Sequence, residues 1–331
     1  MKSMVITQFG DTHVFTAHTL PKPRVKPGYV LIKVMATSIN PLDCKLRKGM
    51  MPDLIKSFPA TLHGDVAGVI EEIGEGVHDF SVGDEVYGCV GGFLDMGGGL
   101  DEYVAADANL IAHKPKTLSL IESAALPLVS LTAFEGLVTY AQVEKGQTVL
   151  VHGGTGGVGH IAIQLAKYLG ARVSATSSSS PKLDMIKQLG ADFAIHYKEM
   201  DVKTYVTKYT HGLGFDVVFD TVGGDNLPQC FEAASLYGQV LSINARGHYD
   251  LTPAFLKGLT IHTILQPLPL ITGKNRVHYQ TILTKMAELV DQGLIKPLID
   301  EKIFAIDDVA AAHAYFESGD AIGKIVLSRT V

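Results

Sequence analysis

A glycine-rich turn directly after a short apolar run is the feature of this sequence that most restricts its fold. The apolar run is Thr148–His152, as expected for a parallel strand covered on both faces. The turn that follows has the pattern G-x-G-x-x-G and consists of Gly154, Thr155, Gly156, Gly157, Val158 and Gly159. Glycines at these places let the chain turn tightly, approach a pyrophosphate and pack a helix on a strand. Because apolar residues then recur at helical spacing up to Gly170, the segment predicts the strand, turn and helix of a dinucleotide-binding unit.

The alternation of strands and helices continues beyond this turn. Strands are predicted near 172–176, 193–196, 216–219 and 239–243, and a helix is predicted over 181–189. This order is typical of a Rossmann domain, an α/β fold with a doubly wound parallel sheet. We therefore predict a dinucleotide-binding domain over residues 125–266.

The rest of the chain predicts a second, mainly β domain. Residues 1–124 are rich in Gly and Pro and contain short alternating apolar runs, such as 30–35 and 66–70. After residue 266 the pattern changes to a long helix over about 276–292 and ends in a strand at 324–327. We expect residues 267–331 to complete a barrel-like domain formed by residues 1–124.

Bulk composition excludes several classes of function. The formal net charge of −6 argues against a nucleic-acid-binding protein, which needs a basic face. No apolar run approaches the roughly 18 residues that span a bilayer, and the amino-terminal segment lacks the apolar core of a secretory signal. Three scattered cysteines, Cys44, Cys89 and Cys230, predict free thiols. We therefore expect a cytoplasmic protein.

A ribose-binding acid is missing from the end of the second predicted strand of the Rossmann domain. NAD sites place Asp or Glu there, about 20 residues after the glycines. The corresponding segment here is 175–182 (ATSSSSPK), with hydroxyls at Ser177 and Ser178 and a cation at Lys182. These groups suit a 2′-phosphate, which a carboxylate would repel, although a serine run also occurs in ordinary solvated loops. NADPH is therefore the predicted cofactor.

Six short motifs occur in order over nearly the whole chain. They are 38–43 (SINPLD), 64–68 (GDVAG), 82–87 (VGDEVY), 152–159 (HGGTGGVG), 187–192 (KQLGAD) and 323–326 (GKIV). In these motifs the chain resembles the medium-chain dehydrogenase/reductase superfamily, specifically its zinc-independent quinone oxidoreductase family. The resemblance implies a GroES-like β-barrel catalytic domain, a Rossmann domain, an active cleft between them and usually a homodimer. The activity that it implies is NADPH-dependent hydride transfer to quinones or α,β-unsaturated carbonyl compounds.

The resemblance also suggests roles for single residues. Besides the glycine-rich turn and the two serines, the candidate cofactor-binding residues are Asn40, Thr132, Lys182, Tyr197, Asn244 and Lys324. Asn40 and Thr132 correspond to positions near the nicotinamide. Lys182 and Tyr197 correspond to positions near the phosphate at the adenosine end.

The places of the metal ligands in zinc-dependent relatives hold other residues. Asn40 stands where the alcohol dehydrogenase branch has a Cys, and Gly64 stands where it has a His. His63 lies one residue away, so in a strand its side chain would point to the opposite face. Catalytic zinc needs three protein ligands, which we cannot assemble. We therefore predict no metal site and a structural role for His63.

The usual proton donor of the relatives is also absent. Enoyl thioester reductases and some quinone reductases have a Tyr about a dozen residues after the Asn, where this chain has Met51. We expect a proton from water and a catalytic role for Asn40, whose amide can donate to the oxygen on which charge develops. Alternatively, Asn40 and Pro41 only form a turn, with Asp43 ordering the same loop. The segment 91–99 is either a mobile lid, with Phe93 over the substrate, or a plain connector.

Two other functions remain open from the sequence. One is enoyl thioester reduction, which Met51 argues against. The other is noncatalytic NADPH binding, as in relatives that serve as crystallins or bind RNA. The sequence does not exclude the second, because both functions need the same nucleotide site.

Overall fold

The computed structural model describes residues 1–330 and consists of two compact units. Unit 1 comprises residues 1–128 and the C-terminal segment from Pro267 onward, and unit 2 comprises Val129–Gln266. The first boundary lies four residues beyond the expected one, because α3 (Pro127–Phe134) runs across residues 128 and 129.

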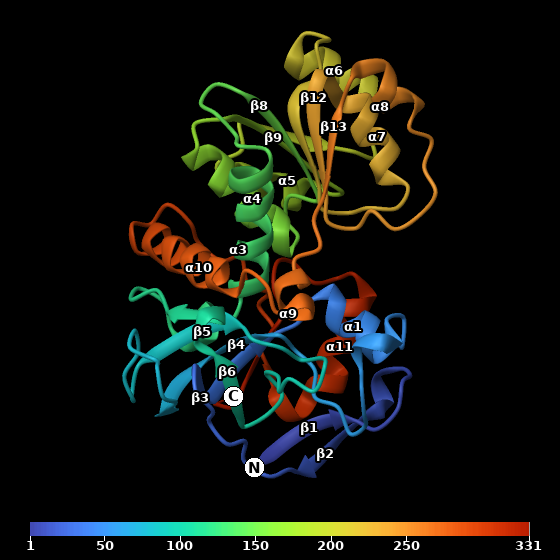
Figure 1. Ribbon diagram of the computed structural model, residues 1–331. Helices are drawn as coiled ribbons and strands as arrows, with labels where there is room; N and C mark the ends of the chain where they lie inside the picture. The colour runs from blue at the N-terminus through green and yellow to red at the C-terminus, as the bar shows by residue number, and fades with distance from the viewer. Residues whose placement is uncertain (331) are drawn as a thin grey trace. The chain divides into compact units, whose positions relative to one another are not determined.

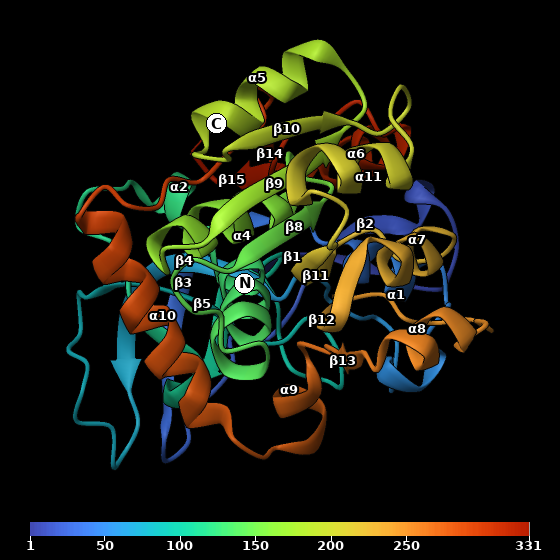
Figure 2. The same cartoon turned by 90° about the horizontal axis from the view of Figure 1, so that it is seen from above.

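Unit 2 is built around a six-stranded sheet with the strand order β10-β9-β8-β11-β12-β13. All five pairings are parallel, and Figure 2 shows the strands side by side in this order. The strands are β8 (Thr148–His152), β9 (Arg172–Ser177), β10 (Phe193–His196), β11 (Phe215–Asp220), β12 (Ala234–Ser242) and β13 (Thr260–Thr263). Numbered within the sheet, the order is 3-2-1-4-5-6, the doubly wound Rossmann order, in which ligands bind where the order reverses. The predicted Rossmann fold is confirmed.

The helices of unit 2 connect consecutive strands, as parallel strands require. After α3 come the π-helix η4 (Glu135–Tyr140), α4 (Gly157–Tyr168), α5 (Ser180–Gln188), α6 (Val202–Thr210), α7 (Asn226–Ala233) and α8 (Thr252–Lys257). The central strands β8 and β11 are buried nearly throughout because helices cover the sheet. Strand β13 was not predicted, since its sequence, Thr-Ile-His-Thr, lacks a long apolar run.

Unit 1 contains a seven-stranded, mainly antiparallel sheet. Its main path is β14-β15-β3-β4-β5-β7, and β6 also pairs with β3. The strands are β3 (Tyr29–Ser38), β4 (Asp65–Ile73), β5 (Glu85–Cys89), β6 (Tyr103–Asp107), β7 (Ile111–His113), β14 (Phe304–Ala305) and β15 (Val326–Ser328). A separate hairpin pairs β1 (Lys2–Ile6) with β2 (Phe15–Thr19). Valine and isoleucine side chains of β3, β4 and β5 form a buried core, which agrees with the predicted β domain.

The C-terminal segment completes unit 1. Strand β15 pairs antiparallel with β3, and Figure 1 shows α11, in red, beside the blue α1. The hydroxyl of Tyr87 on β5 donates to the carbonyl of Leu283 on α10, over 2.7 Å. The helices of unit 1 are α1 (Pro41–Arg47), α2 (Leu120–Ser123), α9 (Leu268–Thr272), α10 (Arg276–Asp291) and α11 (Val309–Ser318), and its short 3-10 turns are η1 (Thr12–Val14), η2 (Pro52–Leu54), η3 (Ala108–Leu110) and η5 (Ile306–Asp308). The predicted long helix is confirmed to within one residue.

None of the helices in residues 1–330 combines the length and the apolar character needed to cross a bilayer.

Candidate active site

The glycine-rich turn connects β8 to α4 in unit 2. Helix α4 begins at Gly157, with Gly156 as its N-cap residue. A Cβ atom on Gly159 would lie 2.1 Å from the carbonyl oxygen of Gly153, so only glycine fits there. This close approach packs α4 onto the turn and leaves the unbonded N–H groups of its first turn as donors for a phosphate.

A cavity of about 730 Å³ lies beside this turn, within unit 2. Five of the predicted cofactor-binding residues line it: Thr155, Ser177, Ser178, Lys182 and Tyr197. Ser177 ends β9, so the place of the ribose-binding acid in NAD sites is held by hydroxyl groups here. Acidic side chains line other parts of the cavity, from or beside α6 and α7: Asp201, Asp225 and Glu232.

The cavity has polar lining residues to which the sequence analysis gave no role. Nδ1 of His152 lies 3.3 Å from the Thr176 hydroxyl, while Nε2 of His152 is buried without a hydrogen-bond partner. Burial lowers the pKa of His152 to about 4, so the ring is neutral at pH 7. The hydroxyl of Tyr205 on α6 is likewise buried without a partner and belongs to a lining residue. His152 is the last residue of β8 and directly precedes the glycine-rich turn. This position in the sequence could have identified it as a residue that lines the cavity.

Asp220 orders the loop on the other side of the cavity. Its Oδ1 accepts hydrogen bonds from the backbone N–H groups of Val222 and Gly223, at 3.0 and 2.9 Å, and from the Asn226 amide at 2.7 Å. Val222 and Asn226 both line the cavity. Asn244, a predicted cofactor-binding residue, contacts this loop through a 3.3 Å bond from its amide nitrogen to the carbonyl of Val222. Sequence analysis missed Asp220 because its partners follow β11 in a turn without a known motif.

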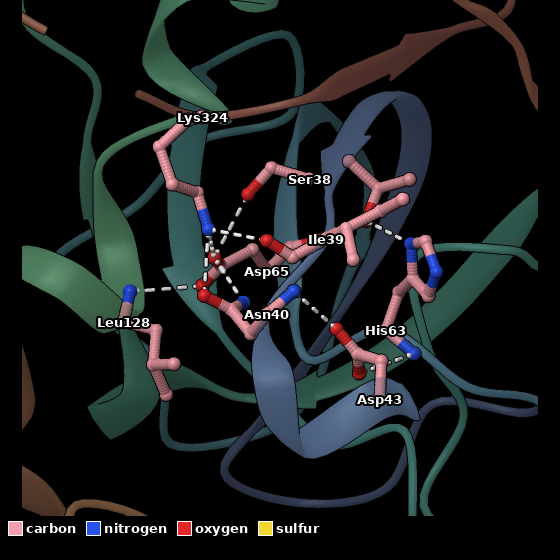
Figure 3. A network of polar contacts seen from close by, with 9 residues as sticks. Ser38, Ile39, Asn40, Asp43, His63, Asp65, Leu128 and Lys324 are labelled. Atoms are coloured by element: carbon pink, nitrogen blue, oxygen red, sulfur yellow. Dashed lines mark hydrogen bonds and ion pairs between the residues drawn. The ribbon is translucent and has the colours of Figure 1, made fainter. Parts of the chain in front are cut away.

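In unit 1, Asn40 lies at the centre of a buried polar network (Figure 3). Its amide nitrogen Nδ2 donates to Oδ2 of Asp65 at 2.7 Å, and its oxygen Oδ1 accepts from Nζ of Lys324 at 2.6 Å. Its backbone N–H donates to Oδ2 of Asp43 at 2.7 Å. Asn40 therefore forms more than a turn: it is the N-cap residue of α1, and its side chain connects a buried carboxylate to a buried ammonium group.

Lys324, a predicted cofactor-binding residue, contacts three protein oxygens. Its ammonium group donates to the carbonyl of Ile39 at 2.8 Å and to Asn40, and lies 3.6 Å from Oδ2 of Asp65. Two of its three hydrogens are therefore used by Ile39 and Asn40, while Asp65 is an ion-pair partner at longer range. Only 3% of the side chain is exposed, and burial lowers its pKa from the usual value. Lys324 thus interacts within unit 1.

His63 is not in a strand. The prediction that its side chain points to the opposite strand face from residue 64 therefore does not apply. His63 lies in the irregular segment before β4 with a left-handed backbone, at φ 69°. Its Nε2 lies 2.9 Å from Nε2 of His313, and Nδ1 of His313 lies 3.4 Å from the Cys44 sulfur. Burial lowers the pKa of His63 well below its usual value and that of His313 to about 3, so both rings are neutral. Such a pair shares one N–H as a buried hydrogen bond.

The part of the chain that the structure describes shows no group of three or more His, Cys, Asp or Glu side chains arranged to hold a metal ion. Cys44, Cys89 and Cys230 are free and buried, as predicted.

The remaining predicted residues belong to separate parts of the chain. Thr132 is buried on α3 in unit 2. Met51 is the partly buried residue before η2 in unit 1. In the segment 91–99, the N–H of Leu94 donates to the carbonyl of Leu54 at 2.7 Å, and Phe93 is buried. These contacts place the segment against the rest of unit 1 in this structure.

Comparison with known proteins agrees with this architecture. Residues 26–116 match the alcohol dehydrogenase GroES-like domain family, and residues 157–277 match the zinc-binding dehydrogenase family. A 2-methylene-furan-3-one reductase of Solanum lycopersicum is 35% identical and an NADPH-dependent alkenal/one oxidoreductase of Arabidopsis thaliana is 34% identical, each over 99% of this chain and 79% of the relative. The solved structure of a quinone oxidoreductase from Coxiella burnetii has a TM-score of 0.85 at 32% identity, and the match covers 99% of both chains.

A GroES-like unit, together with a doubly wound unit that carries a glycine-rich turn, defines a medium-chain dehydrogenase/reductase. Within this superfamily, the chain belongs to the quinone oxidoreductase family and is an NAD(P)-dependent oxidoreductase.

Proposed function

We propose that the protein uses NADPH to reduce quinones or α,β-unsaturated carbonyl compounds by two electrons, without a metal ion. The observation that carries this proposal is the end of β9, where Ser177, Ser178 and Lys182 line the cavity beside the glycine-rich turn. Hydroxyl and ammonium groups favour a 2′-phosphate over a free ribose diol. The names of the tomato and Arabidopsis relatives support the substrate class.

The residues around the turn fit a dinucleotide. Beside Gly156, the only neighbouring atom within 4 Å of an added Cβ is the Gly153 carbonyl oxygen at 3.2 Å, so the space beyond it is open for a pyrophosphate. The unpartnered Nε2 of His152 supplies a further polar group to a ligand in the cavity. In this proposal Thr155 and the start of α4 hold the phosphates, and Lys182 and Tyr197 hold the adenosine end.

Bound NADPH supplies a hydride to the electrophilic carbon or to the quinone. Negative charge then develops on the substrate oxygen, where a hydrogen-bond donor stabilises it. One of the two Nδ2 hydrogens of Asn40 is used by Asp65, so the second is available for this oxygen. Met51 has no proton to donate, and the proposal therefore takes the proton from water.

The test is steady-state oxidation of NADPH with a quinone, an enone, an enoyl thioester and, in reverse, a primary alcohol with NADP⁺. We expect turnover with the first two, unchanged after exhaustive chelation, and little alcohol oxidation, because neither zinc nor a placed base removes the hydroxyl proton. Binding of NADPH without turnover would favour the noncatalytic alternative. A strong preference for the thioester would favour an enoyl reductase, and loss of activity on chelation would show a metal requirement.

We also propose a homodimer in the cytoplasm. In the part of the chain that the structure describes, β13 pairs with β12 on one side only, which leaves its other edge available to a second copy. Light scattering on the purified protein should give twice the chain mass of 35.5 kDa.

A further inference from the structure

We infer that Lys324 and Asp65 are positioning residues that fix the side-chain amide of Asn40 in a single orientation for the reduction. This inference rests on the proposed function of Asn40. It assigns a role to the buried Lys324–Asp65 ion pair, which belongs to neither the glycine-rich turn nor the cavity of unit 2.

The charges on either side of the amide determine which end points where. Oδ1 of Asn40 faces the ammonium group of Lys324 at 2.6 Å, and Nδ2 faces the carboxylate of Asp65 at 2.7 Å (Figure 3). Rotating the amide by 180° would place its N–H groups against the cation and its oxygen against the anion. Because both contacts would become repulsive in a buried site, one orientation is strongly preferred. It leaves one N–H, in a fixed plane, for another acceptor.

The carboxylate of Asp65 is itself held in place. Its Oδ2 also accepts from the Ser38 hydroxyl at 2.9 Å, and its Oδ1 accepts from the backbone N–H of Leu128 at 2.8 Å. Asp65 is fully buried at the start of β4. A carboxylate with this many donors does not rotate freely, so it transmits a fixed geometry to Asn40.

The distances show that the two charges act mainly through the amide. The ammonium group of Lys324 lies 3.6 Å from Asp65 but 2.6 Å from Asn40. A direct ion pair would have shorter contacts, near 2.8 Å. Burying a Lys–Asp pair is costly, and apolar residues of similar size often stabilise a fold equally well. The arrangement is therefore explained better by the orientation of Asn40 than by stability.

A double-mutant cycle tests this inference, with the kcat for a quinone and the Kd for NADPH measured on each variant. We expect Lys324→Met to lower kcat by about 10- to 100-fold and to change the NADPH Kd by less than about threefold, because its effect is on the transition state. In Asn40→Ala, the same Lys324→Met change should lower kcat no further, since there is no amide left to orient.

Two further variants separate positioning from stability. Arg47→Met removes another fully buried cation of unit 1, which pairs with Glu317, and should lower the melting temperature without lowering kcat. If Lys324→Met does not fold, Ser38→Ala removes one bond to Asp65 and keeps both charges; a two- to tenfold drop in kcat that disappears in Asn40→Ala is then expected.

The outcomes distinguish this inference from the proposed function. Absence of turnover in the unaltered protein would overturn both. A normal kcat in Asn40→Ala would refute both the proposed catalytic role of Asn40 and the inference, which depends on that role. If Asn40→Ala is slow but Lys324→Met lowers kcat by the same factor with and without Asn40, only the inference fails. A tenfold weaker NADPH affinity with unchanged kcat in Lys324→Met would identify Lys324 as a cofactor-binding residue instead.

Discussion

Two buried polar regions, the Asn40 network of unit 1 and the cavity of unit 2, differ in how their polar groups are bonded. In unit 1, buried polar side chains bond to one another, as in the contacts of Asp65 with Asn40 and of His63 with His313. In unit 2, His152 and Tyr205 have buried polar atoms without a hydrogen-bond partner, and both residues line the cavity. Buried polar groups cost free energy unless they are hydrogen-bonded. The difference indicates that the Asn40 network of unit 1 is satisfied by protein groups, whereas the polar atoms beside the cavity of unit 2 are left for a ligand.

The largest effects on stability and NADPH binding are expected from substitutions of two glycines in the turn of unit 2. They test whether this unit has an open side for a ligand. Gly159→Ala places a methyl group 2.1 Å from the backbone oxygen of Gly153, so it should destabilise unit 2 by about 3 kcal/mol or more and abolish NADPH binding. Gly156→Ala meets only that oxygen, at 3.2 Å, and φ is −78°. It should leave the melting temperature nearly unchanged and weaken NADPH binding about tenfold or more, because the methyl group occupies the path of the pyrophosphate.

Calorimetry for stability and titration for NADPH affinity separate these two glycine variants. Equal loss of stability in both would mean that the turn has no open side for a ligand.

Falling pH should destabilise unit 1 through its buried pair of histidines, His63 and His313. The pKa values of His63 and His313 are lowered by burial in the folded protein, so the unfolded chain takes up their protons first as pH falls. Their contribution to stability is complete above pH 6.5 and is lost as pH falls toward 3, by up to about 1.4 kcal/mol per pH unit for each ring. His313→Gln should reduce the slope of unfolding free energy against pH between 6 and 4.5. The exposed His13→Gln should leave the slope unchanged; similar slopes in both variants would contradict a neutral buried pair.

Cofactor choice tests whether the cavity of unit 2 is the ligand site. Lys182→Ala should weaken NADPH binding by about 1–3 kcal/mol, or about 5- to 150-fold, and leave NADH binding unchanged. Lys203 lines the same cavity from α6, so Lys203→Ala is the matched control and should have the smaller effect. Equal dissociation constants for NADPH and NADH in the unaltered protein would refute the proposal that Ser177, Ser178 and Lys182 bind the 2′-phosphate.

The smallest expected effect on stability concerns Glu135, a partly buried carboxyl group of unit 2. Burial alone raises the pKa of Glu135 on η4 to about 7. The folded protein therefore binds its proton more tightly than the unfolded chain, and stability falls as pH rises from 4.5 to 7. Glu135→Gln should raise the free energy of unfolding at pH 8 by about 1 kcal/mol and have little effect at pH 4. The exposed Glu144→Gln should have no such pH-dependent effect, and a parallel gain in both would exclude burial as the cause.

The sequence predicts unit 2 better than the network of unit 1, for a physical reason. The glycine-rich turn, its strand and its helix are neighbours in the chain, so local patterns suffice to predict the strand, the helix and the lining role of Thr155. Asn40 and Lys324 are separated by 284 positions, and no local pattern shows that they meet. The motif at 323–326 supported the family resemblance, but a motif does not show which acceptors surround the ammonium group of Lys324.

The left-handed backbone at His63 was likewise not predictable from local patterns. A histidine next to a strand favours an extended conformation, and positive φ is uncommon in residues other than glycine. The conformation is maintained by contacts that only the fold supplies, such as the 3.2 Å bond from the His63 N–H to Oδ1 of Asp43 and the histidine pair with His313.

The position of Lys324 in the C-terminal segment has a consequence for synthesis on the ribosome. Domains fold as units while the chain is being made, and residues 129–266 are complete before Lys324 is translated. Asn40 and Asp65 are made early, but the cation that they bury arrives only with the last strand, β15. The nucleotide-binding unit can therefore fold during translation, whereas the Asn40 network forms only after the segment that carries Lys324 has been made. Asn40 and Asp65 therefore lack their cationic partner until that segment is made, so unit 1 is completed later than unit 2.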